Sequence, residues 1–170
     1  QVQKDSLRKA VVTSTFNNVP ILERVQVLEE LAKDGVDADV AARSLDRTLQ
    51  FASASGLSAR DAVAKVSEVM NAYRLETGDA AKDTAALNQI MDTLQNAANQ
   101  TSSDVEELAE QLIRAAPQAN VLGESLRDTL RAGIGLSEIG IKGDTAGNEL
   151  GIALRDLAQK AIQNRQAFED

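Results

Sequence analysis

Apolar side chains recur every three or four residues along most of the chain, which is the spacing of one face of an α-helix. The run Ile21, Val25, Leu28 and Ala32 is one example. No segment alternates β-branched or aromatic residues with polar ones, as a half-buried strand does. Aromatic residues make up only 2% of the sequence, and a core of small aliphatic side chains is typical of closely packed helices. The pattern therefore predicts an all-α fold without a sheet.

Glycine, serine and aspartate residues predict where these helices end and begin, because they favour C-caps and N-caps respectively. Breaks of this kind are expected at Gly35–Asp37, Gly56–Ser58 and Gly78–Asp79. Further along, Ser103 with Glu106 matches a capping box. Pro117 lacks an amide hydrogen and is expected to kink or end its helix near Ala115.

The breaks divide the chain into about seven to eight helices with short loops capped by Gly, Ser and Asp. Short loops favour antiparallel neighbours, so we expect a compact antiparallel bundle. Its 170 residues are enough for one domain with a real core. We therefore interpret residues 1–170 as a single helical domain and as an excerpt of a longer chain.

The composition argues against catalysis and against most ligand sites. The sequence has no histidine and no cysteine, so it lacks the usual proton shuttle at neutral pH, disulfides and cysteine-based zinc sites. A formal net charge of −8 disfavours a nucleic-acid-binding surface, which needs basic patches. No apolar run approaches the length of a membrane-spanning helix. We expect no cofactor, no metal, no enzymatic activity and no direct nucleic-acid binding.

Acidic residues that lie close together are better explained by helix faces and caps than by a site. General acid–base catalysis needs two carboxyl groups in contrasting environments. Asp34, Asp37 and Asp39 lack the twelve-residue loop of a calcium site, so helix capping is preferred for them. The remaining pairs are expected on solvated faces or in first turns: Glu29–Glu30, Glu106–Glu107 and Asp144 with Glu149.

A glycine-rich segment near the C-terminus allows three interpretations. It is too apolar for a flexible tether, and it lacks the order of residues of a phosphate-binding loop. The preferred interpretation combines helix caps with a close approach of two helices: Gly140 or Gly143 as a C′ residue, and Gly147 and Gly151 on one face of the last helix. Lys142 is expected over the last carbonyls of the preceding helix.

An ordered set of short motifs also resembles a known family. Leu31–Gly35, Gly56–Ser58 and Asn71–Tyr73 stand in the order of its opening segments. The most specific positions follow: Ala116, Pro117, Leu122, Gly123, Gly140, Ile141, Lys142, Gly143, Ala146, Gly147 and Leu150. From about residue 22 to 158 the chain resembles the core domain of tail tape measure proteins of tailed phages and prophages. Gly133, Gly135 and Gly151 depart from the family pattern, and the first two predict a shorter or more mobile helix before Gly140.

The resemblance implies a structural and assembly module of a tape measure protein, in a parent that takes part in tail-length determination, tail assembly and DNA ejection. It implies other tail proteins as partners, namely the tube protein, tail assembly chaperones and the tail tip, with self-association also possible. The implied location is the virion tail, assembled in the host cytoplasm, with membrane contact only through other parts of the parent. The alternative is a generic helical protein–protein interaction domain without a phage context.

Overall fold

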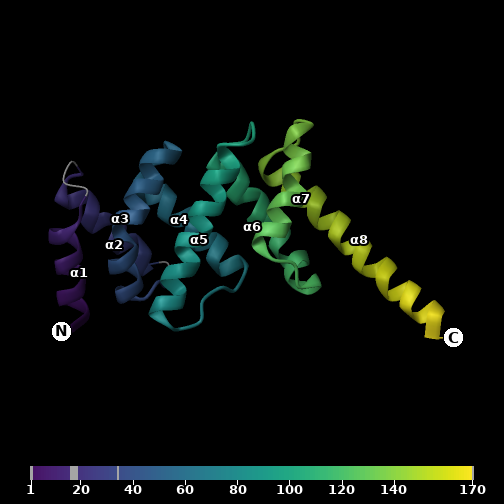
Figure 1. Cartoon of the computed structure of the whole chain (residues 1–170), viewed down its shortest axis with the longest axis horizontal. Coiled ribbons are helices and arrows are strands. Elements are labelled where there is room, and N and C mark those ends of the chain that lie inside the picture. Colours follow the sequence, from purple (N-terminus) through teal and green to yellow (C-terminus); the bar gives the residue numbers. More distant parts are fainter. Residues whose placement is uncertain (1, 16–18, 34, 170) are drawn as a thin grey trace. The chain divides into compact units, whose positions relative to one another are not determined.

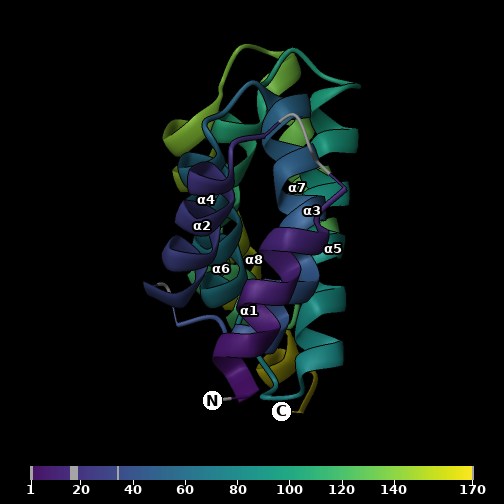
Figure 2. The same cartoon turned by 90° about the vertical axis from the view of Figure 1, so that its left-hand side faces the viewer.

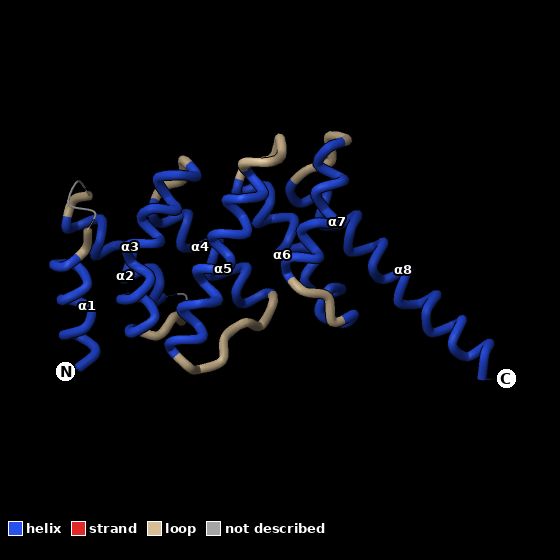
Figure 3. Tube along the Cα trace, in the orientation of Figure 1, coloured by secondary structure: helices blue, strands red, loops and turns tan. Residues whose placement is uncertain are grey.

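Most of the described residues lie in α-helices. The structure, a computed structural model, describes residues 2–15, 19–33 and 35–169, and within these ranges side chains are described from residue 4 to residue 163. Eight helices and no strand are found in these ranges (Figure 3). The expectation of an all-α fold is confirmed. The helices group into two compact units, residues 1–96 and 97–170, which are described separately; that residues 1–170 form one domain stays a prediction.

The N-terminal unit is built from the first five helices. In Figure 2, α1 stands at the front of this unit; it packs on α3 and α2, while α4 packs on α2 and α3. The core of the unit is aliphatic, with Val27, Leu31, Val40 and Leu45 almost fully buried. The bounds are α1 (Val2–Thr13), α2 (Ile21–Lys33), α3 (Ala38–Ser55), α4 (Ala59–Ala72) and α5 (Ala80–Ala98), whose last two residues fall in the second unit.

The predicted breaks in this unit lie between the helices. Asp37 is the N-cap of α3, and its carboxylate accepts a hydrogen bond of 2.8 Å from the amide of Asp39. Gly56 ends the same helix in the left-handed conformation, where glycine has no Cβ strain. Ser58 caps α4 by accepting from the amide of Asp61 at 3.1 Å. These three capping predictions are confirmed; Asp34 lies outside the described residues.

The loop between α4 and α5 is held by a buried carboxylate that the sequence pattern did not single out. Asp83, in the first turn of α5, accepts hydrogen bonds from the Thr77 hydroxyl at 2.7 Å and from the Thr77 and Gly78 amides at 2.8 and 3.1 Å. The Thr77 hydroxyl and these amides stabilise the charged form, so the pKa of Asp83 lies below its ordinary value. The predicted break at Gly78–Asp79 is therefore an ordered loop.

The C-terminal unit contains α6 (Val105–Leu122), α7 (Leu126–Glu138) and α8 (Gly143–Glu169). α6 is the centre of the unit, since both other helices pack on it. Its buried face carries only small and aliphatic side chains around one amide, that of Gln111. In Figure 1, α8 continues beyond α6 and α7 as a single helix, and Leu157 and Ile162 in this part are exposed.

Three predictions about this unit are wrong at least in part. α6 does not end near Ala115 but runs through Pro117, whereas a kink at Pro117 stays a prediction. Pro117 lies on the exposed face while Ala115, Ala116 and Ala119 are fully buried, so tertiary packing outweighs the lost backbone hydrogen bond. α7 likewise runs through the glycines at 133 and 135 and is not shortened by them, whereas the alternative of a more mobile helix stays a prediction.

The third correction concerns the start of α6. The N-cap is Asp104 and not Ser103: Asp104 accepts from the Glu107 amide at 2.8 Å, and the Glu107 carboxylate accepts from the Asp104 amide at 3.2 Å. This is a reciprocal capping box one residue later than predicted. Ser103 is buried, and its hydroxyl has no hydrogen-bond partner in the described part of the chain.

Candidate functional site at the junction of α6, α7 and α8

All the positions that carry the family resemblance most specifically lie in the C-terminal unit. Two of them end helices. Gly123 ends α6 in the left-handed conformation, and the amide of the next residue, Glu124, donates to the Ala119 carbonyl at 2.9 Å. Gly140, with φ of 86°, follows the C-cap of α7. Its neighbour Ile141 donates to the Leu136 carbonyl at 3.0 Å, which completes a Schellman motif.

Gly143 opens the last helix rather than closing α7. It is the first residue of α8 and has a φ of 55°, a conformation that disfavours side chains. A Cβ atom at this position would lie 3.3 Å from the Glu110 carboxylate, so α8 begins close against α6. Gly140 or Gly143 was predicted to be the C′ residue of α7, and the structure shows that it is Gly140.

The contacts of Lys142 differ from those predicted. Its ammonium group donates to the Ser102 carbonyl and lies 3.4 Å from the Glu107 carboxylate. Both partners belong to the beginning of α6 and the loop before it, not to the end of α7. The reason is that the connection over residues 139–142 returns the chain to the N-terminal end of α6. Lys142 thus fixes this connection to the capping box of α6.

Glycines along α8 allow this helix to run against α6 in the same direction. A Cβ atom on Gly147 would lie 2.6 Å from the Gln111 carbonyl oxygen and 2.5 Å from the Arg114 Cβ, so only glycine fits without a shift. At Gly151 the nearest atoms would be 3.9 Å away, an ordinary contact. The two helices pair in the same order: Gly143 with Glu107, Gly147 with Gln111 and Gly151 with Gln118. α6 and α8 are therefore parallel, because α7 returns the chain between them.

Gln111 is the residue at which the three helices meet, and it was not predicted. Its side chain is 1% exposed, and a Cβ atom on Gly133 of α7 would lie 1.7 Å from its Nε2 atom. The Ser137 hydroxyl of α7 lies 3.5 Å from its Oε1 atom. The Nε2 atom has no hydrogen-bond partner among the described residues. Its only signal in the sequence is a polar residue between the apolar positions Leu108 and Leu112.

One bidentate ion pair crosses the surface of this junction. Arg114 of α6 donates from Nε and Nη2 to the two carboxylate oxygens of Asp144 in α8, at 2.9 and 3.0 Å. The hydrogen bonds and charge of Asp144 raise the pKa of Arg114 above its ordinary value. Both side chains are about half exposed, so water screens the pair and its contribution to stability is small. Asp144, predicted to be an acid in a solvated first turn, thus also orients α8 on α6.

The remaining positions of the motif complete the packing of the junction. Ala116 and Ala146 are fully buried, and Leu150 is nearly so. Pro117 and Leu122 lie at the surface of α6. Within the described ranges, no group of His, Cys, Asp and Glu side chains could hold a metal ion, and no described helix is long and apolar enough to cross a membrane. The arrangement is a structural joint that fixes two parallel helices and the helix between them.

Comparison with known proteins places this joint in a family. No solved structure is significantly similar to the chain. A tape measure protein of Pneumococcus phage Dp-1 is 29% identical over 138 residues, which cover 81% of this chain but only 11% of that protein. Residues 16–170 match the model of the family described as phage-related minor tail proteins. Because this match includes both units and nearly the whole sequence, the chain belongs to the family of phage-related minor tail proteins.

Proposed function

We propose that this chain is a structural and assembly module of a tail tape measure protein. The observation that carries the proposal is the family match over residues 16–170, and the similarity to the Dp-1 tape measure protein supports it. The parent protein would take part in tail-length determination and in DNA ejection. The family membership favours this hypothesis over a generic helical interaction domain without a phage context.

The fold suggests which part of that function belongs to the module. A length-setting rod needs long uninterrupted helix, because each helical residue adds about 1.5 Å. The described part of this chain instead divides into eight helices joined by loops, and these helices form two compact units, each with its own apolar core. Its own contribution would be contacts with other proteins, and the exposed apolar residues Ile152, Leu157 and Ile162 of α8 are available for them.

The proposal includes no catalytic step. Carboxylates of the C-terminal unit are used in structure: Asp104 and Glu107 form the capping box, and Asp144 pairs with Arg114. The proposed partners are other tail components, namely the tube protein, the tail assembly chaperones and the tail tip. The proposed location is the virion tail, with assembly in the cytoplasm of the bacterial host.

The test uses a phage or prophage that encodes the full-length parent protein. Gly147→Leu should disrupt the contact between α6 and α8, so we expect fewer assembled tails, while the tails that form should have normal length in electron micrographs. Gly135→Leu is the matched control, because Gly135 is exposed and nothing lies within 4 Å of its Cβ position. It should leave tail number unchanged at equal levels of the parent protein.

Two outcomes would contradict the proposal. A normal number of tails with Gly147→Leu, despite a measured loss of stability in the isolated chain, would mean that assembly does not need the folded module. Tails of altered length would assign the module to the ruler itself.

A further inference from the structure

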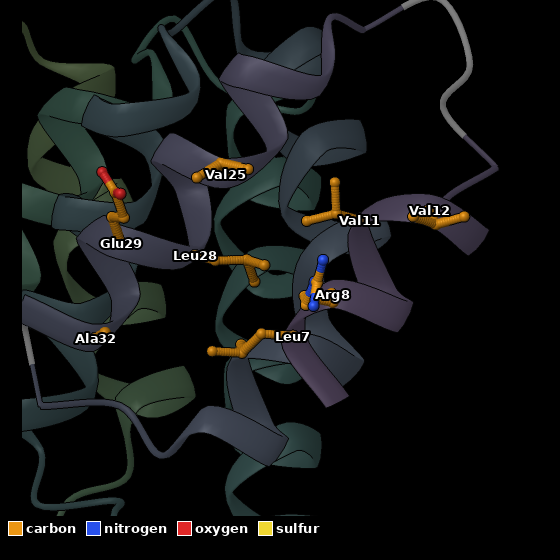
Figure 4. A pocket seen from close by; sticks show the side chains of 8 residues that line it. All are labelled: Leu7, Arg8, Val11, Val12, Val25, Leu28, Glu29 and Ala32. Carbon is orange, nitrogen blue, oxygen red and sulfur yellow. The ribbon is translucent and has the colours of Figure 1, made fainter. Parts of the chain in front are cut away.

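A preformed apolar groove lies between α1 and α2 in the N-terminal unit. Its volume is about 420 Å³. Figure 4 shows side chains from both helices facing this space. The groove is lined by Leu7, Arg8, Val11, Val12, Val25, Leu28, Glu29 and Ala32. Six of these eight residues are aliphatic, so the groove offers an apolar floor with one cation and one anion.

The walls of the groove are held in place by hydrogen bonds. Arg24 of α2 is buried and donates to the Val11 carbonyl of α1 at 2.9 Å and to the Val19 carbonyl at 3.0 Å. Asp46 of α3 accepts from the amide and hydroxyl of Thr15, just after α1, at 3.0 and 2.7 Å. A partner would therefore meet a fixed surface and would not have to order these two helices.

Large apolar side chains remain exposed at one end of the groove. Val12, at the end of α1, is 77% exposed, and Leu22, one turn before Val25 in α2, is 70% exposed. Ile21 beside it is 65% exposed. They lie on the same two helices as the groove residues, and exposed apolar surface of this kind marks interaction sites. We call this surface, Val12, Ile21, Leu22 and the groove residues, the α1–α2 face.

The charges of the α1–α2 face have opposite signs on its two walls. Arg8 lies on the α1 wall, and Glu29 lies on the α2 wall (Figure 4). Lys4, one turn before Arg8, is also exposed on α1. Among the described residues, neither Arg8 nor Glu29 takes part in an ion pair. The two charges that line the groove are therefore a cation on the α1 wall and an anion on the α2 wall, and both side chains are exposed.

We propose that the α1–α2 face pairs with the same face of a second copy of this chain. A two-fold axis brings each surface patch onto its own equivalent, so every contact occurs twice. Under that rotation Arg8 meets the partner's Glu29, Glu29 meets the partner's Arg8, and the apolar surfaces cover each other. A partner segment with charges of only one sign could pair with Arg8 or with Glu29, but it would be repelled by the other of the two residues. Charge complementarity thus favours a second copy as the occupant.

The first measurement is the mass of the 170-residue chain in solution by sedimentation velocity over a range of concentrations. We expect a concentration-dependent dimer. Arg8→Glu and Glu29→Arg should each raise the dimer dissociation constant about tenfold or more, because each variant places like charges opposite each other twice. The double variant R8E/E29R restores both pairs with the signs exchanged and should dimerise as the wild type does.

Mixing the two single variants gives the sharpest test. A chain with Arg8→Glu has two acids on its face, and a chain with Glu29→Arg has two bases. An equimolar mixture should therefore form a heterodimer with both ion pairs intact, although neither variant dimerises well alone. This rescue requires that the two residues contact each other across the two-fold axis.

The apolar part of the face is tested by a matched pair of substitutions. Val12→Asp should weaken the dimer, whereas Val121→Asp at the end of α6, where Val121 is 75% exposed, should not. Circular dichroism melts of all variants check that the fold is retained. A monomeric wild type at all concentrations, a dimer that Val12→Asp does not weaken, or a mixture that gives no heterodimer would each overturn the proposal. These results do not depend on tail assembly, so they are separate from the test of the proposed function.

Discussion

Gly147 of α8 lies so close to Gln111 of α6 that a Cβ atom at position 147 would be 2.6 Å from the Gln111 carbonyl oxygen. That oxygen belongs to the backbone of a buried helix and cannot move away as the end of a flexible side chain could. The contact sets how near two parallel helices approach, and through it the path of α8 beyond α6 and α7. A glycine that interrupts helix propensity is therefore used here for packing.

Gly147→Ala should destabilise the chain by about 1–3 kcal/mol, because the new methyl group overpacks the contact with α6. Urea unfolding followed by circular dichroism measures this loss. Gly135→Ala is the matched control: its Cβ would meet nothing within 4 Å, so the better helix propensity of alanine should stabilise the chain by about 0.5–1 kcal/mol. If the two substitutions changed the free energy of unfolding equally, α8 would not approach α6 closely at Gly147.

Gly133→Ala should destabilise the wild type, since the added Cβ would lie 1.7 Å from the Nε2 atom of buried Gln111. The same substitution in a Gln111→Ala background should instead stabilise by about 0.5–1 kcal/mol, because the obstructing amide is gone and only helix propensity remains. A double-mutant cycle from urea unfolding gives the coupling. If Gly133→Ala has the same effect in both backgrounds, the two residues do not contact each other as described.

Asp104→Ala should destabilise by about 1 kcal/mol, because it removes the side chain that caps the Glu107 amide at the start of α6. Ser103→Ala should be neutral or slightly stabilising, since it removes a buried hydroxyl that has no hydrogen-bond partner in the described ranges. Thermal melts of the two variants separate them. If Ser103→Ala lowered the Tm more than Asp104→Ala does, Ser103 would be the N-cap of α6, as the sequence pattern indicated.

Asp83→Asn should lower the Tm near neutral pH, because the Thr77 and Gly78 donors stabilise the carboxylate. The pKa of Asp83 is lowered in the folded chain relative to the ordinary value of 3.8. Its stabilisation is therefore complete above that value and is lost as the pH falls through the lower folded pKa. The Tm difference between wild type and variant should shrink as the pH is lowered below 3.8. If the Tm difference between wild type and variant stayed constant below that pH, the Asp83 carboxylate would not be the stabilised group.

The sequence by itself determined the local structure of this protein. Helix faces, the cap at Asp37 and the cap at Ser58 depend on side chains within four residues of each other, so spacing alone predicts them. The order of the family motifs also indicated a phage tail protein, and the family match confirms this. The cap of α6 was misplaced by one residue because Ser103 and Asp104 are both good N-caps and only the packed structure selects between them.

Only the tertiary structure decided the contacts between segments far apart in the sequence. Pro117 remains in a helix because the opposite face of α6 is buried, and Lys142 binds the start of α6 because α7 returns the chain there. The meeting of Gly133 and Gly147 at Gln111 depends on the distances between three helices. Periodicity shows which face of a helix is apolar but not which helix covers it, since many pairings bury similar apolar area.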